Sequence, residues 1–173
     1  MAKLSLVSKI FLFLAILFFS LFLGGYVARQ MIIYQLFEPT GLDFKSMYNN
    51  QNLVIVYPTI LPVLILNLVT YATFLISSIV FFVTSKIRIK YEGWLFAIII
   101  IIVTTAPFEI YLSTIDFKIV SMIRSNSAPI NAISELIKER MIVLSSFSLI
   151  EVFSFAAIIF LYLFQPLRKK NEN

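Results

Sequence analysis

The sequence predicts an all-α integral membrane protein, a four-transmembrane-helix bundle with both termini in the cytoplasm. Three observations indicate this. Of 173 residues, 60% are hydrophobic and only 13% are charged, which is too little charge to cover a soluble domain. Four long apolar stretches recur along the chain, and short basic segments flank them. A disordered chain is excluded, because such chains lack the apolar residues that dominate here.

Each apolar stretch has the length that a membrane-spanning helix needs, which is about 20 consecutive residues. The predicted spans are residues 10–28, 60–84, 94–112 and 141–164, with outer loops at 29–59 and 113–140. No internal repeat or low-complexity linker divides the chain, so residues 1–173 are expected to form a single membrane domain.

Basic residues predict the orientation. Eight of them lie before the first span, between the second and third, or after the fourth: Lys3, Lys9, Lys86, Arg88, Lys90, Arg168, Lys169 and Lys170. These short segments carry only two acidic residues, whereas charges nearly cancel in the outer loops. Positive charge concentrates on the cytoplasmic side, so both termini are expected there. The net charge of +5 is thereby explained without nucleic acid as a partner. The expected surroundings are a lipid bilayer, the cell membrane of a bacterium.

The first span also has features of a secretory signal peptide, because Lys3 and Lys9 precede an apolar run. Cleavage requires small residues three positions before the cut. Cleavage after Gly25 would place the large residue Leu23 at that position, and cleavage after Ala28 would place Tyr26 there. An uncleaved first span is therefore preferred.

The first outer loop begins with an apolar segment, Gln30 to Phe37, that either continues the first span or lies in the interface. A turn is expected at residues 38–41, which read EPTG. Pro58 and Pro62 suit the first turn of the second span, where a missing amide hydrogen has no partner, although Pro62 could instead kink that helix.

The second outer loop predicts an amphipathic helix. Ser127 suits its N-cap and Pro129 its first turn, while Ile130, Ile133 and Ile137 share one face. We expect this helix to run without a break into the fourth span and to lie over the outer mouth of the bundle.

Polar residues inside the predicted spans form a candidate site. A charged side chain at the centre of a span costs about 2.5 to 3.5 kcal/mol on insertion. The presence of Glu109 and Glu151 within predicted spans therefore requires an explanation. With a rise of about 1.5 Å per residue, both acids and Asn67 fall at one level, slightly outside the midplane. Further polar residues follow each of them at helical spacing. The candidate pocket comprises Asn67, Tyr71, Glu109, Ser148 and Glu151, with Arg29 as the nearest counter-charge.

Two interpretations of these residues remain open. They can tie the helices together by hydrogen bonds, and Gly24 and Gly25 would then permit close helix approach. Alternatively, they line a pocket for a small ligand, substrate or proton, where buried carboxyl groups act as acid or base. The chain has no Cys and no His. Thiolate chemistry and a Ser-His-Asp relay are therefore excluded, and we expect neither a metal nor another cofactor.

Four segments together resemble the anthrone-oxygenase-like family of small four-span membrane proteins. In chain order they read LGGYVARQ, MYNNQNLVIVYPTILPVL, TTAPFEIYLS and SELIKERMIVLSSFSLIEVFSF. The resemblance implies oxidation of a polyketide anthrone by dioxygen without a metal or organic cofactor. Met141 stands where the family tends to have Trp, and Ser148 falls near the position of an Arg. By position, Asn67, Glu109 and Glu151 would form the site.

Three functions are thus carried forward. The first is an anthrone-oxygenase-like protein with an intramembrane pocket for a hydrophobic small molecule. The second is a non-catalytic accessory subunit that docks on other membrane subunits. The third is a small proton-coupled carrier that uses the same acids.

Overall fold

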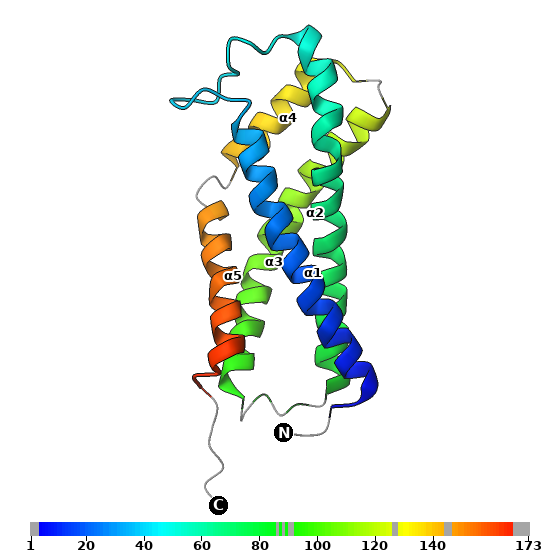
Figure 1. The fold of residues 1–173 in the computed structure, drawn as a ribbon, viewed down its shortest axis with the longest axis vertical. Helices are drawn as coiled ribbons and strands as arrows, with labels where there is room; N and C mark the ends of the chain where they lie inside the picture. The colour runs from blue at the N-terminus through cyan, green and yellow to red at the C-terminus, as the bar shows by residue number, and fades with distance from the viewer. Residues whose placement is uncertain are drawn as a thin grey trace, which may run out of the picture.

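The structure is a computed structural model, and it describes residues 4–85, 87, 89, 92–125, 128–143 and 147–167. Within these residues the chain forms five helices and no strand: α1 (Leu6–Tyr34), α2 (Asn50–Ser85), α3 (Gly93–Ser125), α4 (Ile130–Ile142) and α5 (Phe147–Phe164) (Figure 1). The first three are long and apolar enough to cross a membrane, while α5 is a shorter apolar helix. The all-α fold class and a multi-pass membrane protein are thereby supported. The fourth span and the side on which the termini lie stay predictions.

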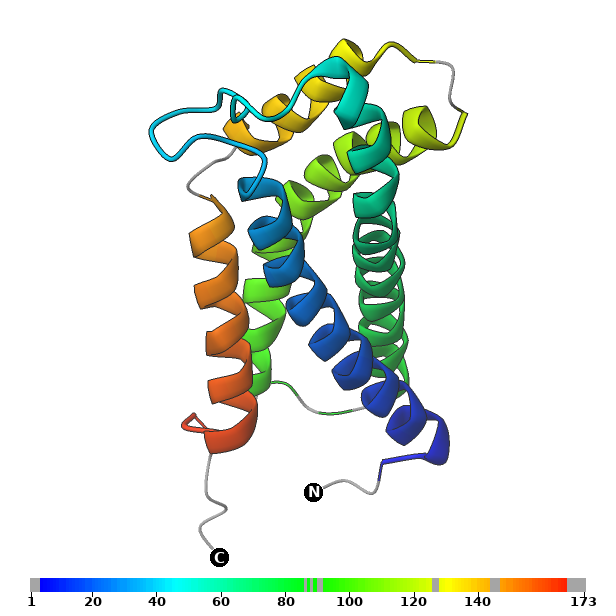
Figure 2. The same ribbon diagram turned by 45° about the horizontal axis from the view of Figure 1, so that its top comes forward.

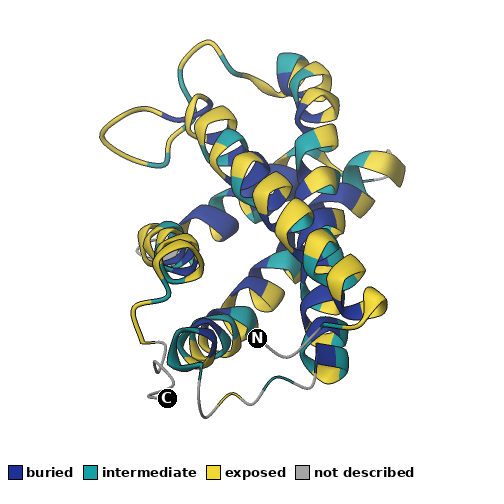
Figure 3. Ribbon diagram, turned by 60° about the horizontal axis from the view of Figure 1, so that its bottom comes forward, coloured by how far each residue is buried: buried dark blue, intermediate teal, exposed yellow. Residues whose placement is uncertain are grey.

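The helices are arranged around α3. Helix α1 packs along α2, while α3 contacts α2, α4 and α5. The short helix α4 crosses one end of the bundle, which we call the α4 end (Figures 1 and 2). Helix α1 begins, and α5 ends, at the opposite end. Buried residues face the interior, and exposed residues cover the outward faces of the long helices (Figure 3).

The structure corrects the predicted start of the helix that contains the second span. Helix α2 begins ten residues earlier than expected, at Asn50 rather than residue 60. The Asn49 side chain caps it by accepting hydrogen bonds from the backbone N–H groups of Gln51 and Asn52. Pro58 and Pro62 therefore lie inside the helix rather than in its first turn.

The second outer loop is also largely helical. Helix α3 continues to Ser125, beyond the predicted end at residue 112, because Ile115, Ile119 and Val120 are buried against other helices. The amphipathic helix from Pro129 is confirmed, with Ile133 and Ile137 buried.

The prediction of one continuous helix from Pro129 into the fourth span is wrong. Val143 has extended backbone and ends α4, and α5 begins only at Phe147. The apolar helix α5 is therefore shorter than the range 141–164 predicted for the fourth span. The proposed N-cap Ser127 lies outside the described residues.

Two apolar clusters fill the interior. One lies toward the α4 end and contains Ile33, Leu64, Ile115 and Ile137 among others. The other consists mainly of aromatic and branched side chains: Phe19, Phe22, Tyr26, Tyr71, Phe74, Ile98, Phe155 and Ile158. Along α1, α2 and α3 the chain passes from one cluster to the other at Arg29, Asn67 and Glu109. The polar residues therefore form a layer between two apolar cores.

The two glycines of α1 have different roles. A Cβ at Gly25 would collide with Oδ1 of Asn67 on α2, whereas a Cβ at Gly24 would meet nothing. Close approach of α1 to α2 therefore depends on Gly25 alone, which corrects the expectation that both glycines permit it.

This difference predicts that Gly25→Ala destabilises the fold and Gly24→Ala does not. Overpacking costs typically about 1–3 kcal/mol, because the Asn67 amide or the helix must shift. Thermal unfolding of the detergent-purified variants measures this, with Gly24→Ala as the matched control. Equal unfolding temperatures for the two variants would show that Gly25 is not a contact point.

Candidate functional site

Five charged side chains from four helices meet in the layer between the apolar clusters. They are Arg29 on α1, Glu109 and Asp116 on α3, Arg140 on α4 and Glu151 on α5. Each is at most 4% exposed. Because isolated buried charges are very unfavourable, their proximity is a requirement of the fold rather than a coincidence.

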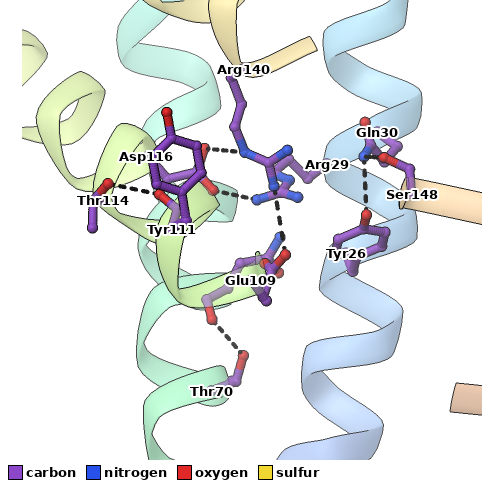
Figure 4. Close-up of polar contacts among 11 residues, drawn as sticks. Tyr26, Arg29, Gln30, Thr70, Glu109, Tyr111, Thr114, Asp116, Arg140 and Ser148 are labelled. Carbon is purple, nitrogen blue, oxygen red and sulfur yellow. Dashed lines mark hydrogen bonds and ion pairs between the residues drawn. The ribbon is translucent and has the colours of Figure 1, made fainter. Parts of the chain in front are cut away.

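Asp116 is the centre of the ion pairs. Its Oδ2 accepts a hydrogen bond from Arg29 Nη1 at 2.5 Å, and its Oδ1 lies 3.3 Å from Arg140 Nε. Arg140 Nη2 also lies 3.9 Å from Glu109 Oε2. Figure 4 shows both guanidinium groups against Asp116, with Glu109 on the other side of Arg140. One carboxylate thus joins α1, α3 and α4.

Glu151 lies next to this network but outside its ion pairs. Its carboxyl group is fully buried beside Glu109 and the hydroxyl of Tyr26. Neither of its oxygens makes a hydrogen bond of ordinary geometry. The described network therefore holds two basic and three acidic side chains, and Glu151 is the acid without an ion-pair partner.

Neutral polar groups surround the acids on the side of α1 and α5. Gln30 Nε2 donates to Ser148 Oγ at 3.1 Å and to the Tyr26 hydroxyl at 3.4 Å. Arg29 also lies 4.8 Å from the centroid of the Tyr26 ring, a cation–π distance. Tyr71 on α2 lies within electrostatic range of both glutamates.

The structure brings together most of the residues that the sequence predicted. Arg29, Glu109 and Glu151 are in the network, and Ser148 and Tyr71 border it. Asn67 is buried in the same layer, but its side chain faces Gly25 of α1. Arg29 pairs with Asp116 rather than with the two glutamates for which it was the expected counter-charge.

Unsatisfied polar atoms concentrate in this layer. Among the described residues, all buried side-chain nitrogen and oxygen atoms without a hydrogen bond belong to Arg29, Asn67, Glu109, Asp116, Arg140 and Glu151. Some of these atoms are ion-paired, but Arg29 Nη2, the Asn67 amide and both Glu151 oxygens are not. An unmet buried group costs about 1–3 kcal/mol, so the layer retains unused hydrogen-bonding capacity.

The layer extends from the interior toward the α4 end. At a rise of about 1.5 Å per residue, Glu109 lies about 24 Å and Asp116 about 35 Å from the start of α3. Glu151 lies about 20 Å from the end of α5 by the same measure. For a hydrocarbon core about 30 Å thick, the glutamates are at membrane depth and the Asp116–Arg140 pair is near its edge.

Sequence reasoning missed Asp116 and Arg140, because both fell in a predicted outer loop. Two signals were present. Asp116 follows Glu109 by seven residues, which is the same helix face. Arg140 follows Ile133 and Ile137 at helical spacing and therefore lies on the apolar face of α4. Among the described residues no group of His, Cys, Asp and Glu is arranged to hold a metal ion.

Asp116→Asn is expected to destabilise the protein by about 3–5 kcal/mol, because two buried arginines lose their counter-charge. Asp43→Asn in the exposed turn after α1 is the matched control and should unfold like wild type. Chemical unfolding in detergent measures both. An unchanged midpoint for Asp116→Asn would mean that the ion pairs do not support the fold.

Comparison of the chain with protein-family models, with curated proteins and with solved structures finds no match. The resemblance to the anthrone-oxygenase-like family therefore stays a prediction from sequence, and the function is argued from the buried network.

Proposed function

We propose that this protein binds a hydrophobic small molecule within the membrane and removes a proton from it at Glu151. In the form implied by the family resemblance, the substrate is an anthrone and dioxygen is the oxidant. The observation that carries the proposal is the fully buried Glu151 carboxyl group, which has no ion-pair partner while the two nearby arginines are held by Asp116.

The site contains separate groups for structure and for reaction. Asp116 engages Arg29 and Arg140 and ties three helices. Arg29 still has Nη2 without a partner, and Glu151 has two unpaired oxygens. A base and an unused cationic donor near each other suit a substrate that loses a proton and develops negative charge on oxygen.

Oxidation of an anthrone would use both the Glu151 carboxyl group and Arg29 Nη2. Glu151 takes a proton from the methylene carbon, and Arg29 Nη2 donates to the carbonyl oxygen as it gains negative charge. The carbanion gives an electron to dioxygen, and recombination forms a carbon-bound peroxide. Loss of water from the peroxide breaks the O–O bond and leaves the quinone. The sum is anthrone and dioxygen to anthraquinone and water, with no electrons from elsewhere.

Substrate can reach Glu151 only if a helix moves, because every charged group of the network is closed off. Helix α4 closes one side through Arg140, and α5 closes the other through Ser148 and Phe155. The extended residue Val143 interrupts the helix between them, so α4 and α5 are not one rigid rod.

A proton-coupled carrier is the second candidate. The observation that favours it is the adjacency of Glu109 and Glu151 at membrane depth, since neighbouring intramembrane carboxyl groups are suited to exchanging a proton. Such a carrier would move protons across sealed vesicles without consuming dioxygen.

We further propose that α5 crosses the bilayer and that both termini are cytoplasmic. At about 1.5 Å per residue its 18 residues extend about 27 Å, close to the hydrocarbon thickness of about 30 Å. The basic residues that flank the predicted spans in the sequence support the same orientation.

Cysteine labelling tests this topology, because the chain has no native cysteine. A membrane-impermeant maleimide applied to intact cells should label Ser46→Cys, in the connection at the α4 end, and should not label Asn173→Cys until the cells are lysed. Labelling of Asn173→Cys in intact cells would show that α5 does not cross.

Glu151→Gln tests the function. Loss of a general base should lower the rate of anthrone oxidation by about 10²- to 10⁴-fold. The same change replaces a buried acid that has no ion-pair partner by an amide of similar shape, so thermal stability should be kept or increased. Dioxygen uptake and quinone absorbance with unsubstituted anthrone measure the rate, and Glu139→Gln on the exposed side of α4 is the control. Full activity of Glu151→Gln, or no oxidation by wild type, contradicts the proposal.

A further inference from the structure

A polar cavity lies at the α4 end, outside the buried network. Its volume is about 190 Å³, and its lining comes from the connection after α1, the start of α2 and α4: Phe44, Tyr48, Asn49, Asn50, Leu53, Asn131, Ser134, Glu135 and Lys138. Water occupies about 30 Å³ per molecule in the liquid, so the cavity holds a group the size of about six waters.

The floor of this cavity is rigid. Leu53 and Ser134 are buried, and Ser134 Oγ shares a hydrogen bond with the Tyr57 hydroxyl at 2.5 Å, which joins α4 to α2. Asn49 is held in place because its side chain caps α2. The hydrogen bonds of Ser134 and Asn49 thus fix the α2 and α4 sides of the cavity, while Phe44 and Tyr48 of the connection after α1 complete its lining.

The walls carry one charge of each sign. Glu135 and Lys138 are three residues apart on α4, so their Cβ atoms are about 5–6 Å apart. Within the described part of the chain neither has an ion-pair partner. Lys138 Nζ instead lies over the Phe44 ring, 5.4 Å from its centroid. The amides of Asn50 and Asn131 likewise make no hydrogen bond with another described residue.

This combination selects among ligand classes. A simple anion would be repelled by Glu135, and a simple cation by Lys138. A ligand without charged groups would pair with neither side chain. A ligand with both charges a few bonds apart satisfies the two side chains together, and the asparagine amides can donate to its anionic oxygens.

We infer that the cavity between α2 and α4 binds a small zwitterionic head group, an anionic phosphate or carboxylate joined by a short linker to a primary ammonium. Lys138 and the asparagine amides hold the anionic end. Glu135 and the ring of Tyr48 hold the ammonium. Such a head group occurs in phosphatidylethanolamine and in free phosphoethanolamine. The inference is independent of the reaction proposed at Glu151.

Native mass spectrometry of the full-length protein in detergent tests this site. Phosphatidylethanolamine and phosphatidylglycerol with the same acyl chains are titrated against wild type, and wild type is expected to bind the former several-fold more tightly. Lys138→Gln should weaken binding of phosphatidylethanolamine about tenfold, since it removes a charge-assisted hydrogen bond to the phosphate. Glu135→Gln should abolish the preference for phosphatidylethanolamine over phosphatidylglycerol.

Glu139→Gln, an exposed carboxylate on α4 outside the cavity, is the matched control and should bind like wild type. Competition by free phosphoethanolamine separates the two sources: displacement of the lipid shows that the head group alone is recognised, and persistence of the lipid shows that its membrane form is the ligand. Equal binding of the two lipids by wild type, or a preference that survives both substitutions, overturns the inference.

Discussion

The structure depends on keeping five charged side chains away from lipid. Two arginines and three carboxylates from four helices are at most 4% exposed, and Asp116 pairs with both arginines. A buried pair that loses one partner costs about 3–5 kcal/mol, so α1, α3 and α4 must stay where Asp116 holds them. The apolar cores on either side are then packed against a fixed polar layer. Gly25 also supports this arrangement, because it lets α1 approach α2 at the level of the polar layer.

Within that layer, the groups differ in how far their charges are paired. Asp116, Arg29 and Arg140 satisfy much of one another's charge, whereas Glu151 is enclosed beside Glu109 without a cation of its own. An arrangement selected only to tie helices together would pair that carboxylate or replace it by an apolar residue of similar volume. Retaining it uncompensated lowers stability, a cost that active and binding sites commonly carry. We therefore regard the Glu151 side as the functional half of the network.

Much of the fold, but less of the site, could be predicted from the sequence. Hydropathy is a property of local composition, so the three long apolar helices, the amphipathic helix after Pro129 and the burial of Glu109 and Glu151 all follow from residue pattern. Helix ends depend instead on capping and tertiary burial. Asn49 extends α2 beyond its prolines, and the buried face of Ile115 and Ile119 extends α3 past the apolar block. Asp116 and Arg140 were missed for the same reason, since a charge in a predicted loop has no assigned partner until the folding of α4 brings one to it.

The claim that the layer around Glu151 holds a ligand is tested most directly by mass spectrometry of the gently solubilised protein, with wild type and Glu151→Gln prepared side by side. Our account predicts a small-molecule adduct, distinct from bound phospholipid, on wild type that is lost from Glu151→Gln although the variant stays folded. The account would be contradicted if wild type carried no such adduct after exposure to anthrone under nitrogen. It would also be contradicted if both proteins carried the adduct equally. Either result would mean that the network is purely structural.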